Sequence, residues 1–178
     1  MEGFLIEENG KYAIDCSQAV WASDNMHTIY HDCGLTDYLC DADFVIETEK
    51  DILLIEYKNA NIPEAIAHTN EKNLYNPLKE DKYNKVVKKF YGSWYYLYLL
   101  GKEKPVKYIF VVEYPKGNAT SRKFLRNALK KYLPFKLQDQ FDKGKQLIDL
   151  VDVKNIDEWN EHEVYGRFPI KSLAQLGG

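Results

Sequence analysis

The fold of this chain is decided by residues 41–58, which read DADFVIETEKDILLIEYK. Two runs of β-branched, aliphatic and aromatic residues, 44–48 and 52–57, flank a short charged connector. Such runs are typical of paired strands. We therefore predict a β-hairpin whose loop consists of Glu49 and Lys50.

This two-residue loop fixes the register of the hairpin. Counting outward from it, Asp43 faces Glu56 and Asp41 faces Lys58. Because side chains alternate along a strand, these four charged side chains share one face. The other face carries Phe44, Ile46, Leu53, Ile55 and Tyr57. A slip of one residue would separate Asp43 from Glu56, so the cluster depends on the register.

Two neighbouring carboxylates repel each other and stay ionised together only beside a positive charge. A divalent cation meets this need, and oxygen ligands suit Mg²⁺ or Mn²⁺. Lys58 lies two residues beyond Glu56, on the same predicted face. From there it could orient a water molecule or neutralise charge on a phosphate. The pattern indicates metal-assisted hydrolysis of a phosphodiester.

The stretch from Asp43 to Lys58 resembles the signature of the PD-(D/E)xK nuclease superfamily. The resemblance implies an α/β, restriction-endonuclease-like fold, with a mixed central sheet flanked by helices. It implies that Asp43 and Glu56 bind Mg²⁺ or Mn²⁺, that the Tyr57 carbonyl adds a ligand, and that Lys58 is catalytic. Asp41 is an accessory candidate. The implied function is a metal-dependent nuclease, with DNA as the expected substrate.

The chain departs from the family pattern in several places. Ala42 stands where the name-giving motif has proline, and no Q-x-x-x-Y motif follows in the long helix. Many members add an acid from the helix before the hairpin, for which the chain offers Asp24 or Asp32. An N-terminal hairpin is expected where the family core would begin with a helix.

Two alternatives stay open. The chain could be a nuclease-fold protein that no longer cleaves and acts as a binding module. It could also be an unrelated α/β protein in which Glu56 and Lys58 form a surface ion pair of little energetic value. The presence of both acids and the lysine argues against the binding module.

The secondary structure of the other segments is predicted from hydrophobic periodicity and from the positions of glycine, proline and other turn-forming residues. We predict a hairpin at 5–14 around Asn9-Gly10, a helix at 17–30, a loop with a helical turn or two at 59–78, a helix at 79–100 ending at Gly101, a strand at 106–114, a helix at 120–133 and a strand at 147–153. This order predicts an α/β class with an additional N-terminal β-hairpin.

The 178 residues, 45% of them hydrophobic, favour one domain spanning 1–178, with a core at about 17–153. The net charge is -3, which gives no global attraction to nucleic acid. Two helix faces are nevertheless basic, and we list them as candidate DNA contacts: Lys82, Lys85 and Lys89, then Lys123, Arg126 and Lys130.

Other site types find no support in the sequence. His27, His31, His68 and His162 show no zinc-hydrolase spacing, and no glycine-rich nucleotide motif is present. Cys16, Cys33 and Cys40 show no paired spacing and are expected to pack as small apolar side chains. The first residues do not read as a signal peptide, and no apolar run has membrane-spanning length. A cytoplasmic protein is expected, and a homodimer is compatible with the sequence.

Overall fold

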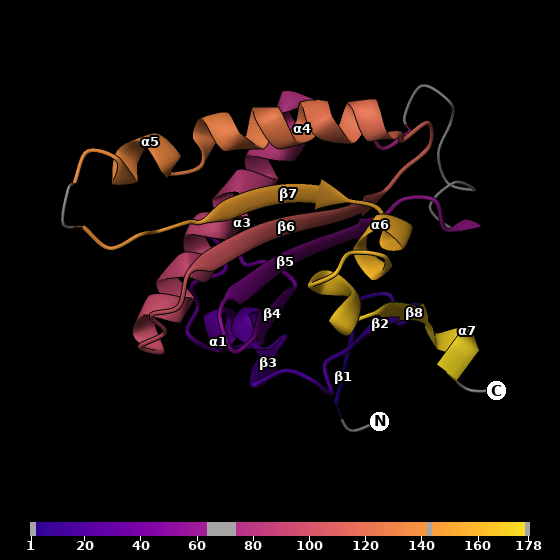
Figure 1. The fold of residues 1–178 in the computed structure, drawn as a ribbon, viewed down its shortest axis with the longest axis horizontal. Coiled ribbons are helices and arrows are strands. Elements are labelled where there is room, and N and C mark those ends of the chain that lie inside the picture. The colour runs from indigo at the N-terminus through magenta and orange to yellow at the C-terminus, as the bar shows by residue number, and fades with distance from the viewer. Residues whose placement is uncertain (1–2, 64–73, 142–143, 177–178) are drawn as a thin grey trace.

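A computed structural model describes residues 3–63, 74–141 and 144–176 (Figure 1). Its centre is a five-stranded sheet with the order β3-β4-β5-β6-β7. The strands are β3 (Trp21–Ser23), β4 (Phe44–Glu47), β5 (Ile52–Asn59), β6 (Val106–Glu113) and β7 (Leu150–Lys154). The first three are antiparallel, whereas β5, β6 and β7 are parallel. The chain is thus an α/β protein with a mixed sheet.

The hairpin of β4 and β5 has the predicted register. Val45 pairs with Leu54, and the Thr48 N–H donates to the Asp51 carbonyl at 2.8 Å. The Thr48 hydroxyl oxygen also accepts from the backbone N–H groups of Lys50 and Asp51, at 3.2 and 2.9 Å. These bonds close the two-residue loop, and the register prediction is confirmed.

Two helices cover one face of the central sheet. They are α3 (Glu80–Leu99) and α4 (Ala119–Tyr132), and the short α5 (Phe135–Gln138) follows α4. Phe90 of α3 and Leu125 of α4 are buried in the same apolar cluster as Tyr108 of β6. Helix α3 ends before Gly101, whose φ of 66° suits glycine best. Both long helices agree with the sequence prediction to within one or two residues.

The opposite face is covered by a second, three-stranded antiparallel sheet of β1 (Phe4–Ile6), β2 (Tyr12–Asp15) and β8 (Ile170–Ser172). With it pack α6 (Ile156–Asn160) and a 3-10 turn (Tyr165–Arg167), and α7 (Leu173–Leu176) follows β8. Trp159 and Phe168 are fully buried there. The buried interior therefore extends beyond residues 17–153 at both ends.

Two local predictions were wrong. Residues 17–30 were expected to form a helix, but β3 pairs with β4 and only α1 (Met26–Asp32) is helical. Pairing with the hairpin decides the conformation there, which overrides weak helical periodicity.

In the N-terminal hairpin, the Asn9-Gly10 signal suggested a two-residue turn with positive φ at both positions. Of these two residues only Gly10 has positive φ, and the loop spans 7–11.

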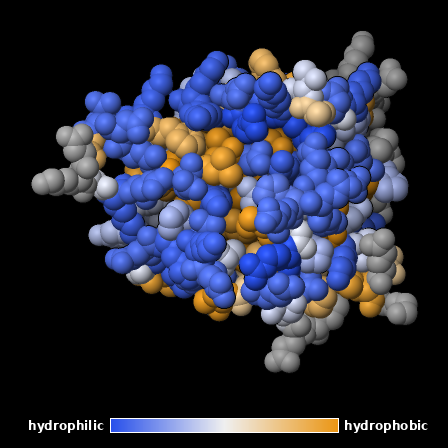
Figure 2. Space-filling view, viewed as in Figure 1, coloured by the Kyte–Doolittle hydropathy of each residue, from blue (hydrophilic) through white to orange (hydrophobic). Residues whose placement is uncertain are grey.

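Residues 64–73, half of the predicted loop at 59–78, lie outside the described residues, and His68 is among them. None of the described helices combines the length and apolar character needed to cross a lipid bilayer. The face shown in Figure 2 is largely hydrophilic, and hydrophobic side chains reach it in separate groups.

Candidate active site

Two carboxylates and one ammonium meet on the face of the central sheet that α3 covers. Lys89 Nζ of α3 lies 2.8 Å from Glu56 Oε1 and 3.5 Å from Asp43 Oδ1. Glu56 belongs to the central strand β5, where only 7% of the residue is exposed. Asp43 directly precedes β4. The predicted meeting of Asp43 and Glu56 on one face is therefore present, with Lys89 between them.

Hydrogen bonds hold both Asp43 and the residue that precedes it. Its Oδ2 accepts from the Tyr57 N–H at 2.7 Å. The preceding residue, Ala42, donates its N–H to the Ser93 hydroxyl of α3 at 2.8 Å. Since Ser93 is fully buried, this bond ties the start of β4 to the helix that supplies Lys89.

We expect Ser93→Ala to lower the free energy of unfolding by about 1 kcal/mol, because the buried Ala42 N–H would lose its partner. Urea denaturation measures the change. Thr28→Ala, which removes an exposed hydroxyl from α1, is the control and should change little. Equal stability of Ser93→Ala and wild type would show that the bond does not anchor this segment.

The site holds its carboxylates in an unfavourable environment. Loss of water around the buried side chain, followed by the charge of Asp43, raises the pKa of Glu56 from 4.5 to about 8. Burial likewise raises the pKa of Asp43, although Lys89 opposes this shift. Burial alone would lower the pKa of Lys89, but the charges of Glu56 and Asp43 outweigh it and raise that pKa. The ammonium thus stays charged beside an acid that titrates near neutral pH.

One oxygen of the site is left without a partner. Glu56 Oε2 is buried and has no hydrogen-bond partner among the residues that the structure describes. A buried carboxylate oxygen in this state calls for a proton or a cation. The raised pKa of Glu56 agrees with a proton there near neutral pH.

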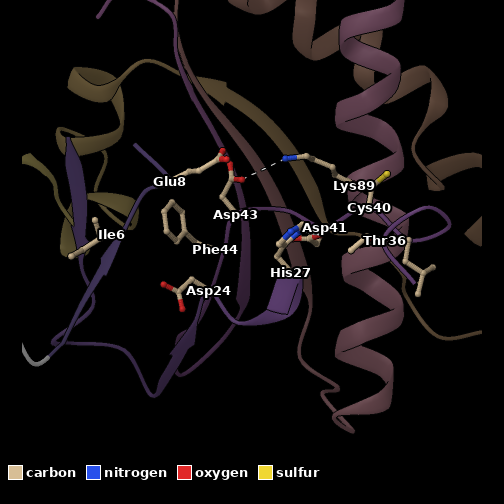
Figure 3. A pocket seen from close by; sticks show the side chains of 11 residues that line it. Ile6, Glu8, Asp24, His27, Thr36, Cys40, Asp41, Asp43, Phe44 and Lys89 are labelled. Carbon is tan, nitrogen blue, oxygen red and sulfur yellow. Dashed lines mark hydrogen bonds and ion pairs between the residues drawn. The ribbon is translucent and has the colours of Figure 1, made fainter. Parts of the chain in front are cut away.

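An open pocket of about 440 Å³ adjoins this site on the side of Asp43, and Glu56 is not among its lining residues (Figure 3). Its walls include Asp43 and Lys89, which Figure 3 joins by a dashed line. Asp41 and His27 lie side by side on the same wall, with Asp41 Oδ1 3.3 Å from His27 Nδ1. Asp24 also lines the pocket. The pocket is therefore rich in carboxylates beyond the central pair.

The other predicted site residues are placed as follows. Lys58 is exposed at the end of β5, and the Tyr57 side chain packs in the opposite apolar cluster, so only the Tyr57 backbone could serve as a ligand. Asp41 contacts His27. Of the two proposed helical acids, Asp24 reaches the pocket, whereas 71% of the Asp32 side chain is exposed.

The two basic faces need correction. Lys89 was predicted to lie on a solvated helix face that contacts phosphates, but it pairs with Glu56 and Asp43 because its position flanks the buried stripe of α3. Arg126 lies 3.7 Å from Asp152 of β7, and Lys82 pairs with its neighbour Asp81. The remaining candidates, Lys85, Lys123 and Lys130, are exposed.

Sequence reasoning missed three residues of this region. Lys89 was assigned to DNA contact, His27 was regarded as incidental, and Glu8 of the N-terminal hairpin loop was not considered, although both line the pocket. A signal existed for Lys89, which lies one position from Phe90 and three from Val86, both buried. No local pattern pointed to Glu8.

The donor set suits a cation that takes few protein ligands. No group of three or more histidine, cysteine, aspartate and glutamate side chains within 3–63, 74–141 and 144–176 is arranged to hold a metal ion. Mg²⁺ typically keeps several waters and binds through one or two carboxylates together with substrate phosphates. Asp43, Glu56 and its unpartnered Oε2 fit that mode.

The prediction for the three cysteines is only partly confirmed. Cys16 is buried as predicted, but Cys33 and Cys40 are exposed, contrary to the prediction that they pack as small apolar side chains. Cys33 follows the last residue of α1, and Cys40 lies in the connection between α1 and β4, so neither is part of a buried strand or helix face.

Comparison with protein-family models, curated proteins and solved structures finds no match for this chain.

Proposed function

We propose that this chain is a metal-dependent nuclease that hydrolyses phosphodiester bonds in DNA at Asp43 and Glu56. One observation carries the proposal, namely the buried and unpartnered Oε2 of Glu56 beside a second carboxylate. A purely structural Glu56 would be expected to have both oxygens satisfied. Perturbed carboxylates at the edge of a pocket are typical of sites that bind a cation and perform hydrolysis.

The architecture supports this proposal. The antiparallel hairpin, the helix α3 that follows it and the parallel strand β6 come in the order that the PD-(D/E)xK resemblance implies. Asp43 stands at the start of one strand and Glu56 near the end of the next. We therefore propose a restriction-endonuclease-like fold with an added N-terminal hairpin.

Asp43 and Glu56 would hold Mg²⁺ or Mn²⁺, with the Tyr57 carbonyl as a further candidate ligand. When bound, the metal supplies Lewis-acid polarisation of the phosphate and a more acidic water. The ammonium of Lys89 forms ion pairs with both carboxylates and thereby reduces the repulsion between them. Lys58, exposed beyond Glu56, would orient the attacking water or neutralise charge on the phosphate.

The exposed Lys85, Lys123 and Lys130 remain candidate contacts to the DNA backbone, and binding through them should weaken as salt rises.

The two lysines should separate cleanly in experiments. We expect Lys58→Ala to reduce kcat for DNA cleavage by about 100-fold, the lower end of what is lost when one charge-stabilising group is removed from an active site. Its melting temperature should not change, because Lys58 is exposed.

Lys89→Ala should instead lower the melting temperature in EDTA, since Asp43 and Glu56 lose their counter-charge. Addition of Mn²⁺ should restore the melting temperature.

Plasmid and single-strand cleavage with Mg²⁺, Mn²⁺ or EDTA, together with thermal melting, measures both effects. Lys136→Ala, which removes an exposed lysine from α5 that is not among the candidate DNA contacts, is the matched control for Lys58→Ala. Full activity of Lys58→Ala would remove Lys58 from the mechanism. Salt-sensitive DNA binding without any turnover by wild type would identify a binding module in place of a nuclease.

A further inference from the structure

A second open groove lies next to the candidate active site. Its volume is about 530 Å³, within the range of about 300–1,000 Å³ that is typical of ligand pockets. It runs between residues 37–40 and α3. Three exposed tyrosines line it, Tyr38, Tyr91 and Tyr95, with exposed fractions of 82%, 45% and 45%.

The tyrosine groove adjoins the active-site pocket. Leu39 and Cys40 line both cavities, so this short segment is common to the two. Asp41, the next residue after Cys40, and Asp43 line the active-site pocket. A strand bound in the groove that passes over residues 39–40 would therefore have its next unit beside Asp43.

The backbone of both walls and one of the three rings are held in position. A Cβ on Gly92 would lie 1.9 Å from the Cys40 carbonyl oxygen, which shows that the 37–40 segment rests directly on the α3 backbone. The Tyr30 hydroxyl donates to the Gly92 carbonyl at 2.7 Å. The Tyr91 hydroxyl donates to the Tyr132 carbonyl of α4 at 2.8 Å, which holds its ring. A ring held in this way loses little conformational freedom when a ligand stacks on it.

The lining of the groove matches the chemistry of a single nucleic-acid strand. Exposed aromatic faces stack on unpaired bases without regard to sequence. Lys88 lines the groove on the helix side, and the exposed Lys85 lies one turn before it, so two cations are available for phosphates. Asp37 is the one acid among the lining residues that the structure describes. Bases in a duplex have their faces covered by neighbours and cannot stack in this way.

We propose that the tyrosine groove binds unpaired nucleotides of single-stranded DNA and places the adjoining phosphodiester at Asp43 and Glu56. This inference rests on the proposed nuclease function for the role of the site, and it adds the class of substrate. The groove selects a single strand, such as an overhang or a strand end, over a continuous duplex.

Fluorescence anisotropy tests the groove directly. A labelled single-stranded oligodeoxynucleotide and a blunt duplex of the same length are titrated with full-length protein in EDTA, so that binding is measured without cleavage. Tyr38→Ala and Tyr95→Ala carry the test, because their removal leaves the Tyr91 to Tyr132 bond intact. Each should weaken single-strand binding by about 5-fold to 150-fold, the range found for loss of one stacked base.

Two controls separate stacking from unfolding. Tyr95→Phe keeps the ring and should bind like wild type. Tyr98→Ala removes another exposed tyrosine of α3, one that stacks on Trp94 and does not line the groove, and it should also bind like wild type. Unchanged single-strand affinity in both Tyr38→Ala and Tyr95→Ala, or tighter wild-type binding of the duplex than of the single strand, would overturn the proposal.

The nuclease proposal fails in a different way. If wild type binds the single strand through Tyr38 and Tyr95 but shows no metal-dependent cleavage, the result supports the proposed binding role of the groove and overturns the proposed nuclease function. If wild type cleaves DNA but both tyrosine variants bind the single strand as tightly as wild type does, the result supports the nuclease function and overturns the binding role of the groove.

Discussion

Manganese is expected to raise the melting temperature of this protein by about 5–10 °C at about pH 9 and by much less at about pH 5. Manganese at 100 times its Kd would stabilise the folded state by about 2.7 kcal/mol. For a chain of this length, each kcal/mol raises the melting temperature by about 2–4 °C, which gives the expected shift. Thermal melting followed by circular dichroism measures it.

The pH dependence has a defined sign. The pKa of Glu56 is raised from 4.5 to about 8, so at about pH 5 a metal must displace a proton from the folded protein. Above about pH 8 the carboxylate is already ionised and the metal binds without that competition. A shift of equal size at both pH values would contradict the assignment of Glu56 as a ligand.

Glu56→Gln should abolish this metal response and stabilise the metal-free protein. Between pH 4.5 and about 8 the folded state binds more protons than the unfolded state, because the pKa of Glu56 is raised. The free energy of unfolding of wild type therefore falls as pH rises through that window. Glutamine resembles the protonated acid, so the free energy of unfolding of the variant should equal that of wild type near pH 4.5 and exceed it by several kcal/mol above pH 8, since one pKa unit corresponds to about 1.4 kcal/mol.

Glu47 provides a matched control on the same hairpin. It is buried to a similar degree, but Lys102 and Lys104 bind it at 2.5 and 2.9 Å. Hydrogen bonds from Lys102 and then Lys104 lower the pKa of Glu47, so its contribution to stability is present at neutral pH and lost in acid. Glu47→Gln should therefore destabilise the protein at neutral pH, opposite to Glu56→Gln. Urea denaturation across the pH range measures both, and loss of stability above pH 8 in Glu56→Gln would contradict the account.

The hairpin could be predicted from the sequence because its determinants are local. Two apolar runs around a charged connector allow one register that keeps the apolar side chains together, and the Thr48 hydroxyl closes that loop in the structure. The long helix at α3 and the strand β6 were equally well defined by periodicity and by Gly101.

Elements that depend on distant partners could not be predicted. Strand β3 has three residues, and it is a strand because Ala22 pairs with Ile46. The C-terminal segment offered no strong local pattern, yet Trp159 is fully buried and β8 pairs with β2. Their conformations follow from packing between segments far apart in the chain.

The same distinction applies to the site. Asp43 and Glu56 were predicted to meet because one hairpin carries both. Lys89 was misassigned because its partners lie 46 and 33 positions earlier in the chain, and the faces of a helix do not reveal which sheet residue a flanking lysine will reach. The pocket positions of Glu8 and His27 depend likewise on how the N-terminal hairpin and α1 pack.

The central claim is that Asp43 and Glu56 support metal-dependent hydrolysis of DNA. The most direct measurement is the rate of cleavage of plasmid and single-stranded DNA in Mg²⁺ or Mn²⁺ by wild type, Glu56→Gln and Glu47→Gln, with EDTA as the blank. We predict cleavage by wild type and Glu47→Gln, and a loss of about 1,000-fold in Glu56→Gln, equivalent to the several kcal/mol that a bound metal contributes. Cleavage by Glu56→Gln at the wild-type rate would contradict it.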